Sequence, residues 1–223
     1  GILCEFAGNP LLTNVDVLAL SRLARAQGLP FIIDDTLGTY RNVDLLPHCD
    51  AVVTSLTKYI SGVSDTTGGA MVLNPASRFF QPFCDYLAGH HEALLWPEDL
   101  ALIEQYSRDF PERMDIINAN AEALCDWLRV QPEVDTVYYP KYTTPEPYRA
   151  VMKDAGGYGG LCSLLLKEPA ARTEAFYDRL RVSKGPSLGT DFTLACPYTL
   201  LAHYGELEAV EAHGVSRWLV RVS

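Results

Sequence analysis

The strongest constraint on the fold comes from short apolar runs, rich in β-branched residues, that lead into polar side chains. "FII" occupies residues 31–33 and "AVV" occupies residues 51–53, and a third run, "GGAMVLN", follows at residues 68–74. Runs of this length that are apolar throughout are typical of strands buried on both faces of a parallel sheet. The first third of the chain therefore predicts an α/β domain, with a mostly parallel sheet and helices on both faces.

A helix is predicted immediately before the first of these runs. Apolar residues recur at helical spacing over residues 17–24, and either Asn14 or Asp16 is suited to cap the first turn. Gly28 is placed to end the helix, and Pro30 prevents its continuation. Helix and strand thus alternate in the way that an α/β domain requires.

The second half of the chain has a different order of elements. A helical pattern runs from Asp99 to about Val130, with Pro111 expected to kink or interrupt it. Strands are predicted at 134–140 and, entered through glycines, at 156–167, before a further helix at 171–181. We therefore expect two domains, with residues 106–223 forming a linking helix and a smaller α+β domain. The chain already opens on a strand-like run, "GILCEF", so residues 1–105 are expected to form the C-terminal portion of a large domain.

Charge and cysteine usage exclude several classes of protein. The net charge is −10 and no basic stripe stands out, so a nucleic-acid partner is not expected. No apolar run is long enough to span a membrane. The six cysteines lie far apart in mostly apolar stretches, which favours small buried side chains in a reducing compartment, and we expect the cytoplasm. His90 and His91 are adjacent and would point to different faces, so no metal site is expected.

Polar side chains follow two neighbouring strands of the predicted sheet. Asp34 ends the first strand, and Ser55, Thr57 and Lys58 stand at or just past the end of the second. Ligands of open α/β sheets gather at the carboxyl ends of strands. A carboxylate, two hydroxyls and an amine suit a phosphorylated ring that carries an aldehyde and a nitrogen, such as pyridoxal 5′-phosphate (PLP). A solvated lysine, a turn aspartate and loop-forming hydroxyls explain the same residues individually, and these residues alone leave both interpretations open.

Longer motifs resemble one family. "FIIDDTLGTY", "AVVTSLTKYISGVSD" and "TGGAMVLNP" resemble the core of the cystathionine γ-synthase family, the fold-type I PLP enzymes of cysteine and methionine metabolism. "CEFAGNPLL" resembles the family's Glu-x-x-x-Asn-Pro strand. "KGPSLGTDFTLACPYTLLAHY" and "GVSRWLVRVS" resemble its substrate-carboxylate region. The likeness extends over nearly the whole chain and is strongest to the fungal branch.

The resemblance implies roles for residues at the matching positions. Lys58 would form the Schiff base with PLP, Asp34 would pair with the pyridine nitrogen, and Ser55 and Thr57 would bind the phosphate. Asn9 would lie near the ring's 3′-oxygen.

The substrate's α-carboxylate would be bound by Arg221, with help from the region of Ser187. A guanidinium suits that role because it grips a carboxylate through two parallel hydrogen bonds. Without the resemblance, Arg221 would be interpreted as a surface residue of a terminal strand.

The resemblance also implies a reaction: replacement of the acyl group of an O-acylated homoserine by cysteine, giving cystathionine for methionine biosynthesis. An O-acetylhomoserine sulfhydrylase, a cystathionine lyase and a γ-substituting paralogue of secondary metabolism remain alternatives. A homodimer or homotetramer with shared active sites is expected.

Several departures from the family's pattern bear on that expectation. The front part of the large domain has no counterpart in this sequence, so an inactive fragment that serves as a structural partner is a further alternative. Ala7, Gly8 and Val63 stand where the family usually has proline, a hydroxyl residue and a polar residue. These changes near the cofactor leave the acyl group and the nucleophile open.

Overall fold

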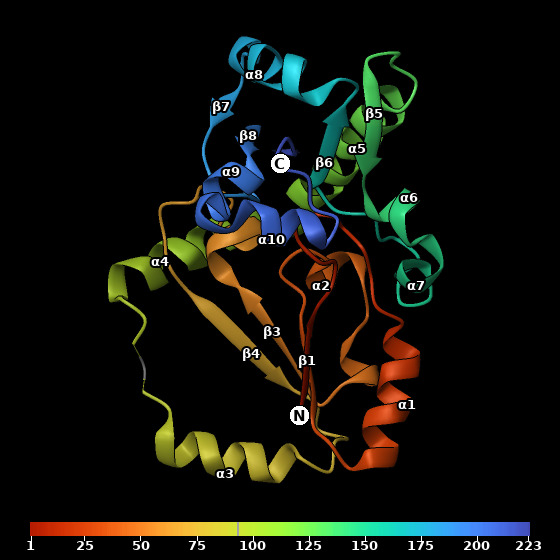
Figure 1. Cartoon of the computed structure of the whole chain (residues 1–223). Coiled ribbons are helices and arrows are strands. Elements are labelled where there is room, and N and C mark those ends of the chain that lie inside the picture. Colours follow the sequence, from red (N-terminus) through yellow and green to blue (C-terminus); the bar gives the residue numbers. More distant parts are fainter. Residues whose placement is uncertain (93) are drawn as a thin grey trace.

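The computed structural model describes residues 1–92 and 94–223 and contains two β-sheets with helices around them (Figure 1). The elements of the first half are β1 (Ile2–Glu5), α1 (Val17–Gln27), β2 (Phe31–Asp34), α2 (Thr39–Asn42), β3 (Ala51–Ser55), β4 (Gly69–Leu73), α3 (Phe80–His90) and α4 (Pro97–Tyr106). Those of the second half are α5 (Phe110–Leu128), β5 (Val134–Tyr138), α6 (Pro140–Thr143), α7 (Pro145–Arg149), β6 (Cys162–Leu166), α8 (Pro169–Arg179), β7 (Ser183–Lys184), β8 (Leu194–Pro197), α9 (Tyr198–Ala202), α10 (Leu207–Ala212) and β9 (Val220–Val222).

The first sheet has the order β1-β2-β3-β4 within the described residues. Strands β1, β2 and β3 run parallel, and β4 runs antiparallel to β3. The prediction of an α/β fold with a mostly parallel sheet is confirmed. Its parallel strands bring Glu5, Asp34 and Ser55, the last residue of each, to the same edge.

Helix α1 shows how the local sequence sets the element bounds. The side chain of Asp16 accepts a hydrogen bond from the backbone N–H of Ala19 at 2.8 Å, so Asp16 is the N-cap. Gly28 ends the helix in the left-handed conformation, with φ of 68°, and its N–H bonds back to the last turn. Val17 and Ala24 are buried against the sheet on the covered face. On the opposite face Leu3 is 72% exposed.

The second sheet has the order β5-β6-β9-β8-β7 among the described residues and is mixed, with parallel pairing only between β7 and β8. It lies beyond the carboxyl ends of β1–β3, as Figure 1 shows. The long helical pattern is interrupted at Ser107–Asp109, and α5 begins at Phe110 with Pro111 in its first turn. Proline is accommodated there because the first N–H groups of a helix have no partner within the helix.

A buried hydrophobic cluster joins the two halves of the molecule. Ala7, Leu12 and Tyr59 from the first half pack with Phe110, Met114, Leu161 and Leu188 from the second. The carboxyl edge of the first sheet therefore faces residues of the C-terminal half instead of open solvent. Over residues 1–92 and 94–223, no helix combines the length and the apolar character needed to cross a bilayer.

Candidate active site

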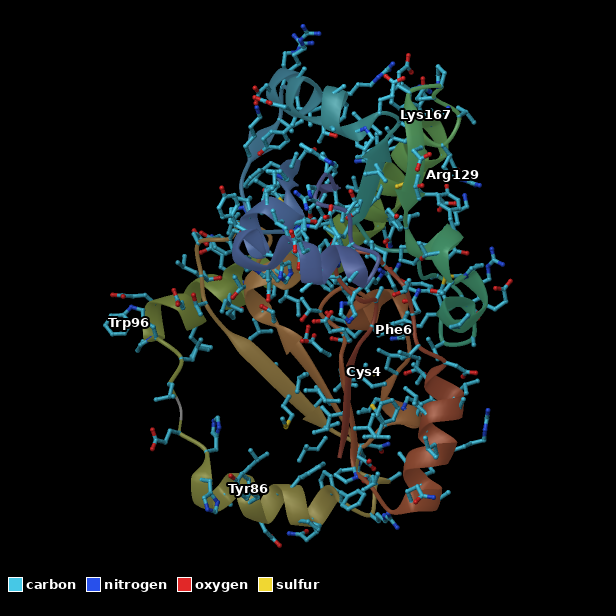
Figure 2. The ribbon with its side chains drawn as sticks, viewed as in Figure 1. Cys4, Phe6, Tyr86, Trp96, Arg129 and Lys167 are labelled. Carbon is cyan, nitrogen blue, oxygen red and sulfur yellow. The ribbon has the colours of Figure 1, made fainter. Side chains whose placement is uncertain are left out.

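A cavity of about 220 Å³ lies at the carboxyl edge of the first sheet. Its polar lining includes Asn9, Asp34, Thr36, Ser55 and Lys58. Figure 2 labels Cys4 and Phe6 on the segment that leads along β1 toward this edge. The volume is below the roughly 300–1,000 Å³ of a pocket for a drug-sized ligand, and it suits one small ring compound.

Thr36 links the two strand ends that line the cavity. Its backbone N–H donates to Asp34 Oδ1 at 2.9 Å, and its hydroxyl oxygen accepts from the backbone N–H of Ser55 at 2.9 Å. Among the described residues, Asp34 Oδ2 and Ser55 Oγ have no protein partner. The edge thus presents an anchored carboxylate and a free hydroxyl to the cavity.

Lys58 reaches the cavity from an irregular turn that follows β3. The turn spans Leu56–Ile60, and the backbone of Lys58 departs from helical geometry, with φ of −86° and ψ of −125°. The amine donates to Ser187 Oγ at 3.4 Å. Burial lowers the pKa of Lys58, and the positive charge of Arg221 lowers it further. Both effects increase the fraction of amine that is neutral and able to accept a proton or attack a carbonyl.

The turn that carries Lys58 is in close contact with a loop of the C-terminal half. Gly189 has φ of +75°, and a Cβ at this position would lie 2.6 Å from Tyr59 N and 3.1 Å from Lys58 Cβ. Only glycine combines this backbone conformation with so close an approach. The same loop contains Ser187, whose hydroxyl lies 2.8 Å from that of Ser64. The two hydroxyls therefore form a short chain that leads away from the Lys58 amine.

Arg221 lies on the central strand β9 and is only 4% exposed. Its Nη1 donates to Asn9 Oδ1 at 3.3 Å, and its Nη2 donates to the carbonyls of Pro186 at 2.5 Å and Ser187 at 3.0 Å. The guanidinium carbon lies 4.9 Å from the ring centroid of Tyr198. A buried cation is thus held in a defined orientation next to Asn9, which itself lines the cavity.

Most of the residues singled out from the sequence are brought together. Asn9, Asp34, Ser55 and Lys58 line the cavity, and Ser187 and Arg221 connect to it through Lys58 and Asn9. Thr57 is placed differently.

The hydroxyl of Thr57 accepts a hydrogen bond from Gly68 N at 3.1 Å, and Thr57 is not part of the cavity lining. The prediction that Thr57 binds phosphate has no support from the cavity lining, and it stays a prediction.

Three further residues at the site were not singled out as functional from the sequence. Thr36 stands two positions after Asp34 at the same strand end, so the reasoning applied to Asp34 could have found it. The hydroxyl of Tyr198 accepts from Asn9 Nδ2 at 3.3 Å, and its ring lies beside Arg221. Ser64 has no signal in a single sequence that would connect it with Ser187.

Comparison with known proteins identifies the chain at the level of a family. The profile of the Cys/Met metabolism PLP-dependent enzymes matches residues 1–223. The chain belongs to this family. Cystathionine γ-synthase of Neurospora crassa is 47% identical over 223 residues, which is 100% of this chain and 36% of that protein.

Solved structures agree with the sequence comparison. Cystathionine γ-synthase of Xanthomonas oryzae pv. oryzae, in complex with aminoacrylate and cysteine, superimposes with a TM-score of 0.88 at 29% identity, over 99% of this chain and 57% of that one. Cystathionine γ-lyase of Lactobacillus plantarum, complexed with L-serine, gives 0.89 at 27% identity, over 100% and 58%. The chain therefore spans little more than a third of the curated relative and somewhat more than half of the solved structures.

The cofactor of the family is PLP, and the residues at the cavity fit its chemistry. Lys58 supplies an amine for an aldehyde, and Asp34 supplies a carboxylate for a protonated ring nitrogen. Ser55 supplies a hydroxyl without a protein partner among the described residues. The three groups line one cavity of about 220 Å³: Asp34 and Ser55 end two adjacent parallel strands, and Lys58 lies in the turn that follows the second.

Proposed function

We propose that the protein is a PLP-dependent enzyme that replaces the γ-acyloxy group of an O-acylated homoserine with the thiol of cysteine, forming cystathionine. The observation that carries the proposal is the arrangement of three side chains. The Lys58 amine and the Asp34 carboxylate line the same cavity, and the Arg221 guanidinium lies behind Asn9 on its wall.

PLP, when bound, supplies an aldehyde for covalent attachment and a ring that accepts electrons from the substrate's α-carbon. Asp34 is suited to keep the ring nitrogen protonated, because its second oxygen is free to accept a hydrogen bond. Thr36 holds that carboxylate in place through the 2.9 Å bond to Oδ1. Ser55 is suited to donate to the phosphate.

Lys58 is suited to accept and return protons at the substrate's Cα and Cβ. An ordinary lysine has a pKa of about 10.4 and is almost fully protonated at neutral pH. Burial and the neighbouring Arg221 lower the pKa of Lys58 and so favour its use as a base. The hydroxyl of Ser187 at 3.4 Å gives the amine a fixed resting position.

Arg221 is suited to bind the substrate's α-carboxylate. A buried guanidinium favours an anion strongly because little water is present to compete. Its contacts with Asn9 and with two backbone carbonyls hold the guanidinium plane in one orientation. The same residue that lowers the pKa of Lys58 would thus bring the substrate's Cα toward that amine.

A lyase is the second candidate. The cystathionine γ-lyase of L. plantarum superimposes as well as the γ-synthase does, with TM-scores of 0.89 and 0.88. Sulfhydrylation and γ-substitution by another nucleophile use the same residues. The chemistry common to all these candidates is labilisation of the α-proton followed by loss of a γ-substituent.

Product analysis separates these candidates. The full protein, loaded with PLP, is incubated with O-acetyl- or O-succinylhomoserine and with cysteine, with sulfide, or with no nucleophile. In a separate assay it is incubated with cystathionine alone. We expect cystathionine with cysteine present and little 2-oxobutanoate. Rapid 2-oxobutanoate formation from cystathionine would favour the lyase, and homocysteine formed from sulfide would favour the sulfhydrylase. Failure to convert any of these substrates, with the cofactor attached, would contradict the proposal.

We also propose that the protein works as a homodimer or homotetramer in the cytoplasm. Leu3 is 72% exposed and Met71 is 48% exposed on the first sheet, so apolar surface is available for a further contact. Light scattering of the full holoprotein tests this, and a monomer with full activity would contradict it.

A further inference from the structure

The backbone carbonyls that follow Lys58 have an unusual partner. Within the turn Leu56–Ile60, Ser61 N bonds to Leu56 O, and Gly62 N bonds to Lys58 O. Over the part of the chain that the structure describes, no backbone N–H donates to the carbonyls of Tyr59 or Ile60. Buried carbonyls without a partner are costly, so these two require a donor from elsewhere.

The donor is Arg113, in the first turn of α5. Its Nη1 donates to Tyr59 O at 2.6 Å, and its Nη2 donates to Ile60 O at 3.1 Å. Nη2 also donates to Tyr106 O at 2.9 Å, and Asp109 accepts from Nε and Nη2. The side chain of Arg113 is 12% exposed, so the contact is largely shielded from water.

Gly62 makes room for the guanidinium. A Cβ at this position would lie 2.2 Å from Arg113 Nη1, and φ of Gly62 is +81°. Glycine is therefore required both for the conformation and for the close approach of the arginine. The turn is enclosed on one side by Arg113 and on another by Gly189, which lies against Tyr59 N and Lys58 Cβ.

We propose that Arg113 is a positioning residue for Lys58: by holding the carbonyls of Tyr59 and Ile60, it fixes the turn from which the lysine amine reaches the cavity. This inference rests on the proposed role of Lys58. The effect is geometric, since the pKa of Lys58 is set by burial and by Arg221. The planar guanidinium can donate to the carbonyls of Tyr59, Ile60 and Tyr106 at the same time. The ammonium group of a lysine is a single point of charge and cannot hold three carbonyls in a fixed geometry.

The test compares Arg113→Gln and Arg113→Lys with Arg108→Gln in the full protein. Arg108 is a matched control, because it is another arginine of the same helical region, but its side chain is 70% exposed and pairs only with Glu104 among the described residues. The first readout is the rate at which added PLP attaches to Lys58. Samples taken over time are reduced with borohydride, and peptide mass spectrometry measures the fraction of Lys58 that carries PLP. The second is kcat and KM, and the third is the melting temperature.

For Arg113→Gln we expect the attachment of PLP to Lys58 to slow about tenfold. We expect kcat to fall about ten- to a hundredfold, because a slightly misplaced catalytic group costs a rate of this scale, and KM to change less than about threefold. Arg113→Lys should lie between this variant and the wild type, and Arg108→Gln should match the wild type.

Unchanged attachment and kcat in Arg113→Gln would overturn the inference. Loss of folding in both Arg113 variants would also overturn it, because the arginine would then support the fold as a whole. A wild-type protein that forms no adduct at Lys58 would instead contradict the proposed function.

Discussion

The Lys58 amine lies 3.4 Å from the Ser187 hydroxyl, although the two residues are 129 positions apart in the sequence. One belongs to the turn after β3, and the other to a loop of the C-terminal half. The contact shows that the candidate active site is assembled from both halves of the chain. Changes to either half should therefore alter the chemistry of the same amine.

Replacement of Lys58 by alanine should abolish covalent attachment of PLP and reduce turnover to background, because no other amine lines the cavity among the described residues. The check is the absorbance of PLP that stays with the protein after gel filtration. Borohydride reduction and mass spectrometry then show whether PLP is attached covalently. Lys167→Ala is the control, since Lys167 lies at the far end of the C-terminal half (Figure 2) and donates to Pro132 O. Appreciable turnover by Lys58→Ala would refute the assignment of this lysine.

Asp34→Asn should lower kcat by about a hundredfold or more, on the scale of losing one preoriented electrostatic contact. The amide can still accept from Thr36 N, so the variant should fold, but it no longer stabilises a protonated ring nitrogen. Steady-state kinetics measure the effect, and Asp44→Asn serves as the control, because Asp44 is exposed and does not line the cavity. Equal kcat for Asp34→Asn and the wild type would count against a direct role of this carboxylate.

Two substitutions of Arg221 should separate its two effects. Arg221→Lys and Arg221→Gln should both raise KM for the amino-acid substrate, by about ten- to a hundredfold, because both lose the bidentate contact. Only Arg221→Gln should also raise the pKa of Lys58, since Arg221→Lys keeps the positive charge that lowers it. The pKa is measured by NMR titration of Lys58 after reductive ¹³C-methylation of the cofactor-free protein. The same Lys58 pKa in all three proteins would show that Arg221 does not influence the amine.

Asp35→Asn should stabilise the protein at alkaline pH. Burial raises the pKa of Asp35 to about 6, and the neighbouring Asp34 adds to this, while a hydrogen bond from Thr54 opposes it. A folded-state pKa above the unfolded value means that ionisation disfavours the folded state. The cost is absent below pH of about 4, grows as the pH rises to about 6, and is complete above it, reaching about 3 kcal/mol.

Urea denaturation at several pH values checks this prediction. The free energy of unfolding of Asp35→Asn should exceed that of the wild type at pH 8, and the difference should shrink as the pH is lowered toward 4. Asp16→Asn is the control because Asp16 accepts from Ala19 N at the exposed end of α1. A difference in the free energy of unfolding that does not vary with pH would mean that the stabilisation by Asp35→Asn does not come from removing a buried charge.

Local sequence was sufficient to predict the strands of the first sheet and the site residues at their carboxyl ends. The runs before Asp34 and Ser55 have the length and composition of buried strands, and parallel strands necessarily bring their ends together. The α/β class is confirmed, whereas the domain boundary between residues 105 and 106 stays a prediction.

Other parts of the site depend on contacts between distant segments. Arg221 meets Asn9 across 212 positions, and nothing in the local sequence specifies that contact; the resemblance to a family suggested both residues. Thr57 shows the opposite problem, because the resemblance gives it a phosphate-binding role, whereas its hydroxyl accepts from Gly68 N and lies outside the cavity lining, with its O–H left to donate. The sequence around Arg113 predicts only an ordinary helical arginine, and its contact with the carbonyls of Tyr59 and Ile60 is seen only in the structure.

The approach of Gly189 to the backbone of Tyr59 and Lys58 bears on how such enzymes can be recombined. A chimera that joins the first half of one paralogue to the second half of another must reproduce this contact, since a Cβ at position 189 would lie 2.6 Å from Tyr59 N. Exchanges of the C-terminal half should therefore keep the Ser187–Gly189 loop and the Lys58 turn from the same parent. A new nucleophile specificity would then be sought in segments that leave this pair undisturbed.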